Sequence, residues 1–220
     1  MNKKENGGPL ERRVGSPVQL VSVGAEPGLD DADLVRAFSK GESWAARAIW
    51  TRHAPMVHRL LERALGPNGD AEDLTQDVFL RTFAALPGLR DHNALRSFIY
   101  SVGLRILKWE LRRRRVRRIL YLSPTGQLPD LPARAVDSEA RQILARFYTL
   151  LEQLGVNERM AFALRHMEGC KLEEIAESMG VSLATVKRWV SRGAQSVSAL
   201  VEADPELAAY FRQGGGFHAR

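Results

Sequence analysis

The chain has 220 residues, enough for one large domain or two small ones, and 45% of them are apolar, a normal share for a folded protein. Its net charge of +6 favours a polyanionic partner, either nucleic acid or an acidic membrane surface. The single cysteine, Cys170, excludes an intramolecular disulfide and a cysteine-based metal cluster and fits a reducing compartment. No apolar run approaches the ~18 residues of a membrane span, and no signal peptide is recognisable, so we expect a cytoplasmic location.

The N-terminal part is predicted to be a tail followed by a helix. Residues 1–28 are rich in glycine and proline and are interpreted as a disordered tail, in which 18–23 could form a short strand that lacks a pairing partner. Asp30 or Asp31 is expected to cap the first helix, and Gly41 is expected to end it.

Three further helices follow in the N-terminal half. The second is expected over about 43–65, kinked or split by Pro55, and the third over 70–86. The fourth, over about 94–118, carries apolar residues at three- and four-residue steps, which indicates one buried face. Its second half is strongly basic, with eight Lys or Arg residues and one acidic residue between positions 105 and 118.

The C-terminal half is predicted to be a second helical domain. Residues 119–138 hold three prolines and no helical period, and are interpreted as an interdomain linker. Helical periodicity returns over 139–202, and the Ala- and Gly-rich segment 203–220 is interpreted as a C-terminal tail. The predicted fold class is therefore all-α, with helical domains over 29–118 and 139–202 joined by a flexible linker.

The strongest local pattern is KLEEIAESMGVSLATVKRWVSRGAQ at 171–195. A short amphipathic helix, Gly180 for a sharp turn and Ser182 as the cap of a second helix together form a helix-turn-helix. The second helix turns a polar, basic face outward, made of Ala184, Lys187, Arg188, Ser191, Arg192 and Gln195. Because such a helix can enter the major groove, we favour DNA binding over the alternative, an ordinary helical hairpin with a solvated face.

A second pattern is the basic run WELRRRRVRR at 109–118. A basic run alone is most often solvated, but this one extends an amphipathic helix, so its arginines project from a fixed scaffold and are expected to contact phosphates. The four tryptophans are expected to pack against the protein rather than to stack on bases: Trp44, Trp50, Trp109 and Trp189.

A third pattern, DAEDLTQDVFLRTFAAL at 70–86, places Asp73, Gln76, Asp77 and Leu80 on one outward helical face. An acidic face on a basic protein avoids phosphate and suits a protein partner. A solvated face stabilised by acidic residues in the first helical turn fits the charge pattern equally well.

No catalytic, metal or cofactor site is expected. His166 and Cys170 lie four residues apart, but Gly169 is expected to end their helix, and two ligands make no zinc site. The sequence carries no glycine-rich phosphate loop and no Ser-His-Asp or clustered-carboxylate arrangement, so we expect no enzyme.

Three segments, in order, resemble a bacterial RNA polymerase sigma factor of the extracytoplasmic-function (ECF) group of the sigma-70 family. DAEDLTQDVFL resembles region 2.2, which grips the polymerase clamp coiled coil. ALRSFIYSVGLRILKWELRRRRVRR resembles regions 2.3 and 2.4, which meet the minus-ten promoter element. ERMAFALRHMEGCKLEEIAESMGVSLATVKRWVSRG resembles region 4, which reads the minus-thirty-five element. The resemblance spans about residues 30–201, and three motifs in the right order and at the right separation are more specific than one helix-turn-helix.

The resemblance implies a sigma factor that binds core RNA polymerase and directs promoter recognition and transcription initiation. Promoter DNA is the second implied partner and an anti-sigma factor a further candidate, with no cofactor and no membrane insertion. The implied polymerase contacts are Asp73, Gln76, Asp77 and Leu80. The implied contacts of the recognition helix with DNA are Ser182, Thr185, Lys187, Arg188, Ser191 and Arg192. The implied minus-ten contacts are Arg90, His92, Asn93, Tyr100, Arg105, Lys108, Arg112 and Arg113, of which the loop 90–93 matches the place where the family captures a flipped base.

The chain departs from the family pattern at several positions. In the recognition helix, KRW at 187–189 stands where relatives commonly have Lys-Ser-Arg, and RGA at 192–194 stands where they have Arg-Ala-Arg. Leu154-Gly155 replaces a Leu-Pro pair, and Lys171 replaces Ser or Thr. We therefore expect an unusual promoter preference.

Two alternatives remain at this point. One is a helix-turn-helix regulator that binds DNA without engaging core polymerase, and co-elution with core polymerase separates it from a sigma factor. The other is a recombinase with a similar terminal DNA-binding unit, but no residues are left over for a nucleophile domain.

Overall fold

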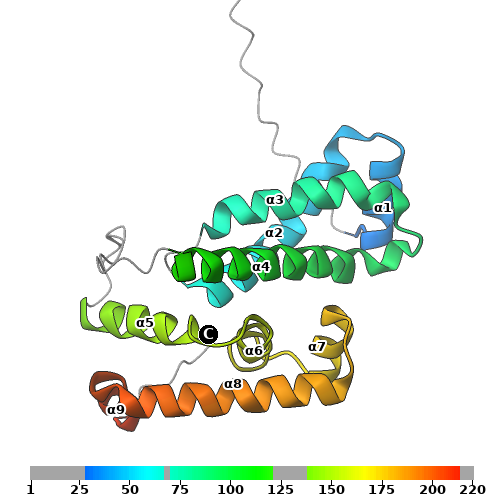
Figure 1. Cartoon of the computed structure of the whole chain (residues 1–220). Helices are drawn as coiled ribbons and strands as arrows, with labels where there is room; N and C mark the ends of the chain where they lie inside the picture. The colour runs from blue at the N-terminus through cyan, green and yellow to red at the C-terminus, as the bar shows by residue number, and fades with distance from the viewer. Residues whose placement is uncertain (1–27, 67–69, 121–137, 214–220) are drawn as a thin grey trace, which may run out of the picture.

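A computed structural model describes residues 28–66, 70–120 and 138–213. These residues form helices, turns and loops and contain no strand, which confirms the predicted all-α class. The helices lie in two layers, α1–α4 in one and α5–α9 in the other (Figure 1). Residues 1–27 of the predicted N-terminal tail, with the possible strand at 18–23, and residues 121–137 of the predicted linker fall outside the described residues.

The first layer is built from long helices with apolar faces turned inward. Asp30 caps its first helix through a reciprocal pair of hydrogen bonds with Asp33, as the sequence predicts. The second helix runs unbroken through Pro55, so the predicted split is wrong; buried residues on both sides of the proline, such as Ile49 and Val57, hold it in place. The α-helices are α1 (Asp31–Ser39), α2 (Ser43–Leu65), α3 (Ala71–Ala85) and α4 (Leu95–Leu120), with short 3-10 helices η1 (Leu86–Gly88) and η2 (His92–Ala94) before α4.

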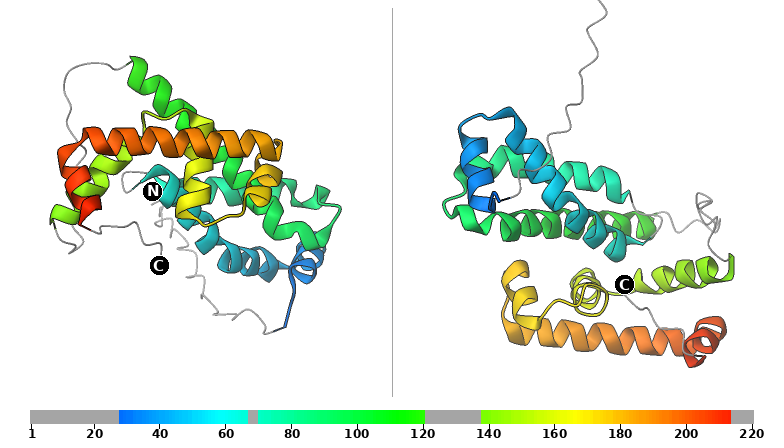
Figure 2. Two further views of the ribbon diagram at one scale, coloured as in Figure 1. Left: turned by 90° about the horizontal axis from the view of Figure 1, so that it is seen from below. Right: turned by 180° about the vertical axis from the view of Figure 1, so that it is seen from behind.

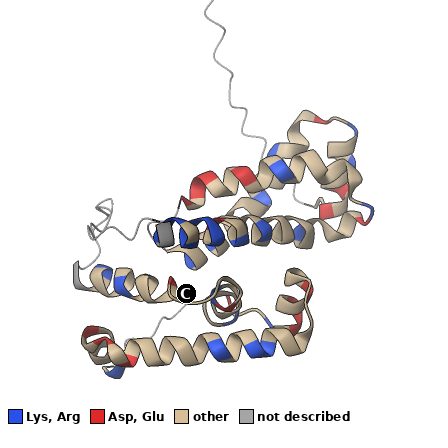
Figure 3. Cartoon of the chain, in the orientation of Figure 1, with Lys and Arg blue, Asp and Glu red and all other residues tan. Residues whose placement is uncertain are grey.

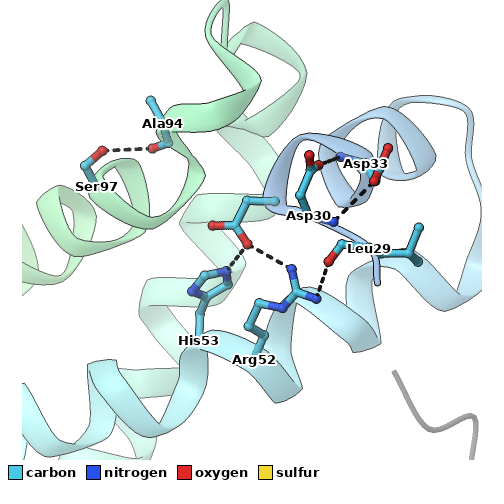
Figure 4. A network of polar contacts seen from close by, with 8 residues as sticks. Leu29, Asp30, Asp33, Arg52, His53, Ala94 and Ser97 are labelled. Carbon is cyan, nitrogen blue, oxygen red and sulfur yellow. Dashed lines mark hydrogen bonds and ion pairs between the residues drawn. The ribbon is translucent and has the colours of Figure 1, made fainter. Parts of the chain in front are cut away.

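A polar network fastens α1 to α2 (Figure 4). Arg52 donates a hydrogen bond to the Asp31 carboxylate at 3.1 Å and another to the Leu29 carbonyl at 2.8 Å. The His53 ring lies 3.1 Å from the same carboxylate, and burial lowers the pKa of His53 despite that contact. Because α1 also packs against η2, this network supports the loop that leads into α4.

The second layer contains shorter helices that cross a long one. Its elements are α5 (Ser138–Leu151), α6 (Val156–Phe162), the π-helical turn η3 (Ala163–Met167), α7 (Leu172–Met179), α8 (Leu183–Ala203) and α9 (Pro205–Arg212). Gly193 of α8 is buried against α6: a Cβ there would lie 3.1 Å from the Glu158 carbonyl oxygen and 3.3 Å from Phe162 Cβ. The glycine therefore permits a close approach of α8 to α6.

The prediction that 203–220 is a C-terminal tail is wrong for residues 205–212, because these residues form α9. Asp204 caps this helix by accepting hydrogen bonds from the backbone N–H groups of Glu206 and Leu207, each at 3.1 Å. Leu207 is fully buried, and the Phe211 ring lies 6.3 Å from that of Phe147 on α5. A buried leucine stabilises a helix against the layer beneath it, whatever the alanine and glycine content of the segment.

Apolar side chains of both layers join in one cluster, and a second apolar cluster lies within the second layer. Leu61 and Leu107 are buried in the first layer, and Leu164, Ile175 and Val186 of the second layer belong to the same cluster. The view from behind in Figure 2 shows α4 lying along the face of the second layer. The two layers are therefore packed together in this structure, through α4 against α6 and α7 and through α2 against η3.

The C-terminal end of α2 is held by polar groups of the second layer. The Arg159 guanidinium, 4% exposed, donates to the Ala64 carbonyl at 2.9 Å and to the Leu65 carbonyl at 3.4 Å. Burial lowers the pKa of Arg159 to about 10, so the group keeps its positive charge at neutral pH. A cation at this position is attracted to the negative end of the helix dipole. Its N–H groups also bind carbonyls that have no partner within the helix. Tyr148 adds a hydrogen bond to the Arg63 carbonyl at 3.0 Å.

Candidate nucleic-acid interface

α7, the turn and α8 form a helix-turn-helix whose geometry matches the predicted one. Gly180 adopts φ 65° and ψ 40°, a left-handed conformation that glycine reaches without a steric penalty. The Ser182 side chain accepts a hydrogen bond from the Thr185 N–H at 3.2 Å, and the two hydroxyls lie 2.9 Å apart. Ser182 and Thr185 therefore form the cap that starts α8. Lys171, where relatives have Ser or Thr, begins α7 with its backbone N–H bound to the Glu174 carboxylate at 2.8 Å.

The outward face of α8 carries the predicted basic residues. Val186 on the opposite face is fully buried against α7 and the first layer, which fixes the rotation of α8 about its axis. Four of the predicted DNA contacts on this face are exposed: Lys187, Arg188, Ser191 and Arg192. They form one arc over the first half of the helix, free of the rest of the protein, as a major-groove reader requires.

The second basic surface lies along α4. Figure 3 shows Lys and Arg concentrated on the C-terminal half of α4 and on the first half of α8. Arg105 and Arg112 are exposed and Lys108 is half-buried, whereas Arg113 is engaged by Glu110. The Arg113 guanidinium donates to both oxygens of the Glu110 carboxylate, at 2.7 and 3.0 Å. Of the predicted α4 cations, Arg105, Lys108 and Arg112 are therefore more readily available to phosphate.

Glu110 is a buried carboxylate that organises the basic run. It is 1% exposed and also accepts a hydrogen bond from Arg114 at 2.8 Å. Burial alone would raise the pKa of Glu110, but the hydrogen bonds from Arg113 and Arg114 outweigh that effect and lower it. The carboxylate therefore stays charged and fixes both guanidinium groups on the surface of α4.

Tyr100 differs from the other predicted minus-ten residues because the second layer covers it. Its hydroxyl lies 3.5 Å from the Cys170 sulfur, and the ring packs against the interlayer core. Burial, with a smaller effect of the Cys170 contact, raises the pKa of Tyr100. Promoter contact by Tyr100 would require the second layer to move away from α4.

The loop before α4 presents its predicted residues at the edge of the first layer. Arg90 and Asn93 are exposed and His92 is half-buried. The Asp91 carboxylate accepts a hydrogen bond from the Asn93 N–H at 3.0 Å, which shapes η2. The loop is thus ordered by its own side chain and by packing against α1.

The acidic face of α3 is open. Asp73, Gln76, Asp77 and Leu80 are all exposed, and Leu80 is 68% exposed, the most exposed of the large apolar side chains that the structure describes. Leu74, Val78 and Phe79 on the other side of the helix are buried. The face is therefore open to a partner, and its charge suits a basic or neutral surface.

The prediction that all four tryptophans pack against the protein is wrong for Trp109. This side chain is 57% exposed on α4, because Glu110 rather than Trp109 occupies the inward position at this level of the helix. Its place four residues after Arg105 and four before Arg113 was the signal in the sequence that could have put it on the basic face. Among the described residues, no group of three or more potential metal-ligating side chains is present.

Models of two sigma-70 regions match this chain. Sigma-70 region 2 matches residues 49–117, from α2 to the basic part of α4, and Sigma-70, region 4 matches residues 144–197, including the helix-turn-helix. The ferric citrate uptake sigma factor FecI of Escherichia coli is 30% identical over 154 residues, which cover 67% of this chain and 86% of FecI. The chain belongs to the sigma-70 family.

Similarity to two further sigma factors places this chain in the ECF group. The ECF RNA polymerase sigma-E factor of Escherichia coli is 26% identical over 199 residues, covering 79% of this chain and 95% of the relative. The RNA polymerase sigma factor CnrH of Cupriavidus metallidurans is 27% identical over 187 residues, covering 80% and 98%.

Two solved structures share the fold of this sigma factor. CnrH in complex with the cytosolic domain of CnrY matches with a TM-score of 0.56 at 24% identity, covering 79% of this chain and 98% of that one. The sigma factor RpoE in complex with the anti-sigma factor NepR from Bartonella quintana matches with a TM-score of 0.52 at 21% identity, covering 70% and 95%. In the described part of this sigma factor, we find no helix with the length and apolar character of a membrane span.

Proposed function

We propose that this sigma factor binds core RNA polymerase through the acidic face of α3 and promoter DNA through α8, α4 and the loop before α4. The observation that carries this assignment is the separation of charge: the exposed acidic face lies on α3, whereas exposed cations lie on α4 and α8 (Figure 3). DNA is a polyanion, so it is attracted to the basic surfaces of α4 and α8 and repelled by the acidic face of α3. The proposed domains are 29–118 for polymerase and the minus-ten element and 139–202 for the minus-thirty-five element.

The proposed roles on DNA follow from exposure and chemistry. Arg188 and Arg192 can donate two hydrogen bonds to a guanine edge, while Lys187 suits a phosphate. Ser182 and Thr185 start α8, and the positive end of the helix dipole there favours a phosphate oxygen. Along the minus-ten element we assign phosphate contacts to the cations of α4: Arg105, Lys108, Arg112 and Arg113. The loop before α4 captures a base through Arg90, His92 and Asn93. Tyr100 contacts DNA only after the two layers have separated.

The remaining assignments rest on the likeness to other sigma factors. CnrH and RpoE were solved with CnrY and with the anti-sigma factor NepR, and we infer that an anti-sigma factor is a candidate partner here too. We place the chain in the cytoplasm, where polymerase acts, and assign it no catalytic site and no cofactor of its own.

Co-elution with bacterial core RNA polymerase on size exclusion tests the proposal. A stoichiometric complex is expected. A purified chain that binds DNA but elutes apart from core polymerase would instead support the alternative, a helix-turn-helix regulator.

Arg188 should set base preference in the upstream element, because a longer charged side chain stands where relatives commonly have Ser. Changing Arg188 to Ala should relax the preference at one or two guanines by ~1–3 kcal/mol per base. Changing Lys187 to Ala should weaken binding evenly across sequences, as loss of a phosphate contact does. The measurement is binding of the holoenzyme to a panel of upstream-element variants at fixed salt. An equal loss with Arg188→Ala on every variant would make Arg188 a phosphate contact.

The exposed cations of α4 should account for part of the salt dependence of promoter binding. Replacing Arg105, Lys108 and Arg112 together with Ala should flatten the slope of log K against log salt by about 2–3 units, at ~0.7–0.9 per phosphate. Arg36, which pairs with Asp33 on α1, provides the control, and Arg36→Ala should leave the slope unchanged. An unchanged slope in the triple variant would show that these cations are merely solvated.

A further inference from the structure

A small cavity lies between the two layers, beside the C-terminal half of α4. Its volume is about 150 Å³, and a cavity of that size holds a group about as large as benzene. α4 contributes one part of its wall, and the turn after α5 and the helix α6 contribute the other. The charged side chains that line it come from both layers: Arg114, Arg115, Arg117, Arg118, Glu152 and Arg159.

Positive charge gathers in this cavity with little to balance it. Figure 3 shows the cations along the C-terminal half of α4. The Glu152 carboxylate lies 3.8 Å from the Arg118 guanidinium, but the two side chains are 42% and 49% exposed, so water screens their attraction. Among the described residues, Arg115 and Arg117 are in no ion pair. Because these guanidinium groups repel one another, a polyvalent anion between them is favoured.

Two of the arginines are fixed in place before any ligand arrives, one in each layer. The buried Glu110 carboxylate accepts a hydrogen bond from Arg114 at 2.8 Å, and the carbonyl of Ala64 accepts one from Arg159 at 2.9 Å. Burial and, to a smaller extent, the charge of Arg114 lower the pKa of Arg159 to about 10, so the two groups lie within electrostatic reach across the layers. Side chains that are already ordered lose little entropy when an anion binds.

The size and charge of the cavity favour two linked phosphates. A guanidinium group can pair with two oxygens of one phosphate, so several arginines can share a diphosphate. A sulfate or a single phosphate carries too little charge to balance the five arginines of the lining. A whole nucleotide is larger than a cavity of this volume and a DNA duplex is too wide to enter it, so only the diphosphate end of a nucleotide fits inside.

We propose that this cavity binds a diphosphate group, which bridges the two layers and stabilises them against separation. The arginines of α4 bind it from one layer, and the positive charge of Arg159 attracts it from the other. Layers that have moved apart no longer form the cavity, so the ligand favours the packed arrangement, in which Tyr100 and Cys170 lie against each other. The site does not depend on the function proposed above.

Calorimetric titration of the full chain with sodium pyrophosphate, in magnesium-free buffer at fixed ionic strength, tests the binding. We expect one site that binds pyrophosphate at least about 10-fold more tightly than sulfate, since each added charge-assisted hydrogen bond contributes about that factor or more. Equal affinity for adenosine diphosphate would identify the diphosphate alone as the ligand, and a tighter nucleotide complex would identify it as the end of a nucleotide.

Variants from the two layers should change the affinity for pyrophosphate in opposite directions. Replacing Arg115 and Arg117 together with Gln should weaken binding about 10-fold or more, because both are exposed and removing them deletes phosphate contacts without disturbing the core. Glu152→Gln should strengthen binding about 1.5- to 5-fold, since it removes a carboxylate from the lining. Arg59→Gln is the matched control, because Arg59 is exposed on α2, outside the lining, and should leave the affinity unchanged.

Reaction of Cys170 with a thiol reagent tests the bridging. Cys170 is the single cysteine of the chain and lies 3.5 Å from the Tyr100 hydroxyl, between the layers. Pyrophosphate at ten times its Kd should slow the reaction that follows separation of the layers by about 10-fold, and should not slow it in the variant that lacks Arg115 and Arg117. The inference is overturned if pyrophosphate binds no more tightly than sulfate, if Arg59→Gln weakens binding as much as the double variant, or if bound pyrophosphate leaves the reaction of Cys170 unchanged.

Discussion

Changing Asp77 to Arg should weaken binding of this sigma factor to core polymerase by about 100-fold or more. Asp77 is exposed on the same face of α3 as Asp73 and Leu80, and a polymerase surface that fits this face must be basic or neutral. An arginine there places like charges together, which costs several kcal/mol at an interface. The side chain lies outside the core, so the helix should still fold. The measurement is the Kd for core polymerase, with circular dichroism to verify the helical content.

Glu42→Arg provides the matched control for Asp77. It makes the same change of charge at an exposed residue just before α2 that is not part of the α3 face, and should leave polymerase binding close to normal. A folded Asp77→Arg protein that binds polymerase as well as the control would show that the α3 face is merely solvated.

Changing Leu207 to Ala should lower the free energy of unfolding by about 2–5 kcal/mol, the usual cost of emptying a fully buried leucine position. Leu207 is 0% exposed in a cluster with Phe147, Leu151 and Val197, so the truncated side chain leaves a cavity between α9, α5 and α8. Urea unfolding of the full chain, followed by circular dichroism, measures the change.

Glu206→Ala is the control for Leu207 on the same helix. Glu206 forms an exposed ion pair with Arg146 at 2.8 Å, a kind of contact that contributes at most about 1 kcal/mol. If Leu207→Ala is no less stable than Glu206→Ala, α9 does not pack as described and the segment behaves as the tail that its composition suggests.

The helix-turn-helix was predictable because local residues determine it. The Gly180 turn, the Ser182 cap and the burial of Val186 are each visible within a few residues of sequence, and the structure places all three as expected. The C-terminal helix was missed although a local signal existed: Asp204 and Pro205 are a cap and a first-turn proline, a combination that starts helices.

Trp109 and Arg159 show where a sequence pattern is insufficient. The apolar period of α4 suggests an inward Trp109, but Glu110 takes that position because Arg113 and Arg114 balance its charge. Arg159 donates to a carbonyl about 95 residues away in the chain. A pattern read over a few neighbouring residues cannot predict such a contact. The packing of the two layers depends on such contacts, and so does the covering of Tyr100.

The most direct test of the account is transcription initiation by core polymerase on promoter-containing DNA, with and without this chain. Core polymerase and the chain together should form stable complexes on a subset of DNA fragments and start RNA at fixed positions on them, whereas neither component alone should do so. Specific DNA binding by the chain alone, with no initiation when core polymerase is added, would contradict the account and identify a DNA-binding regulator instead.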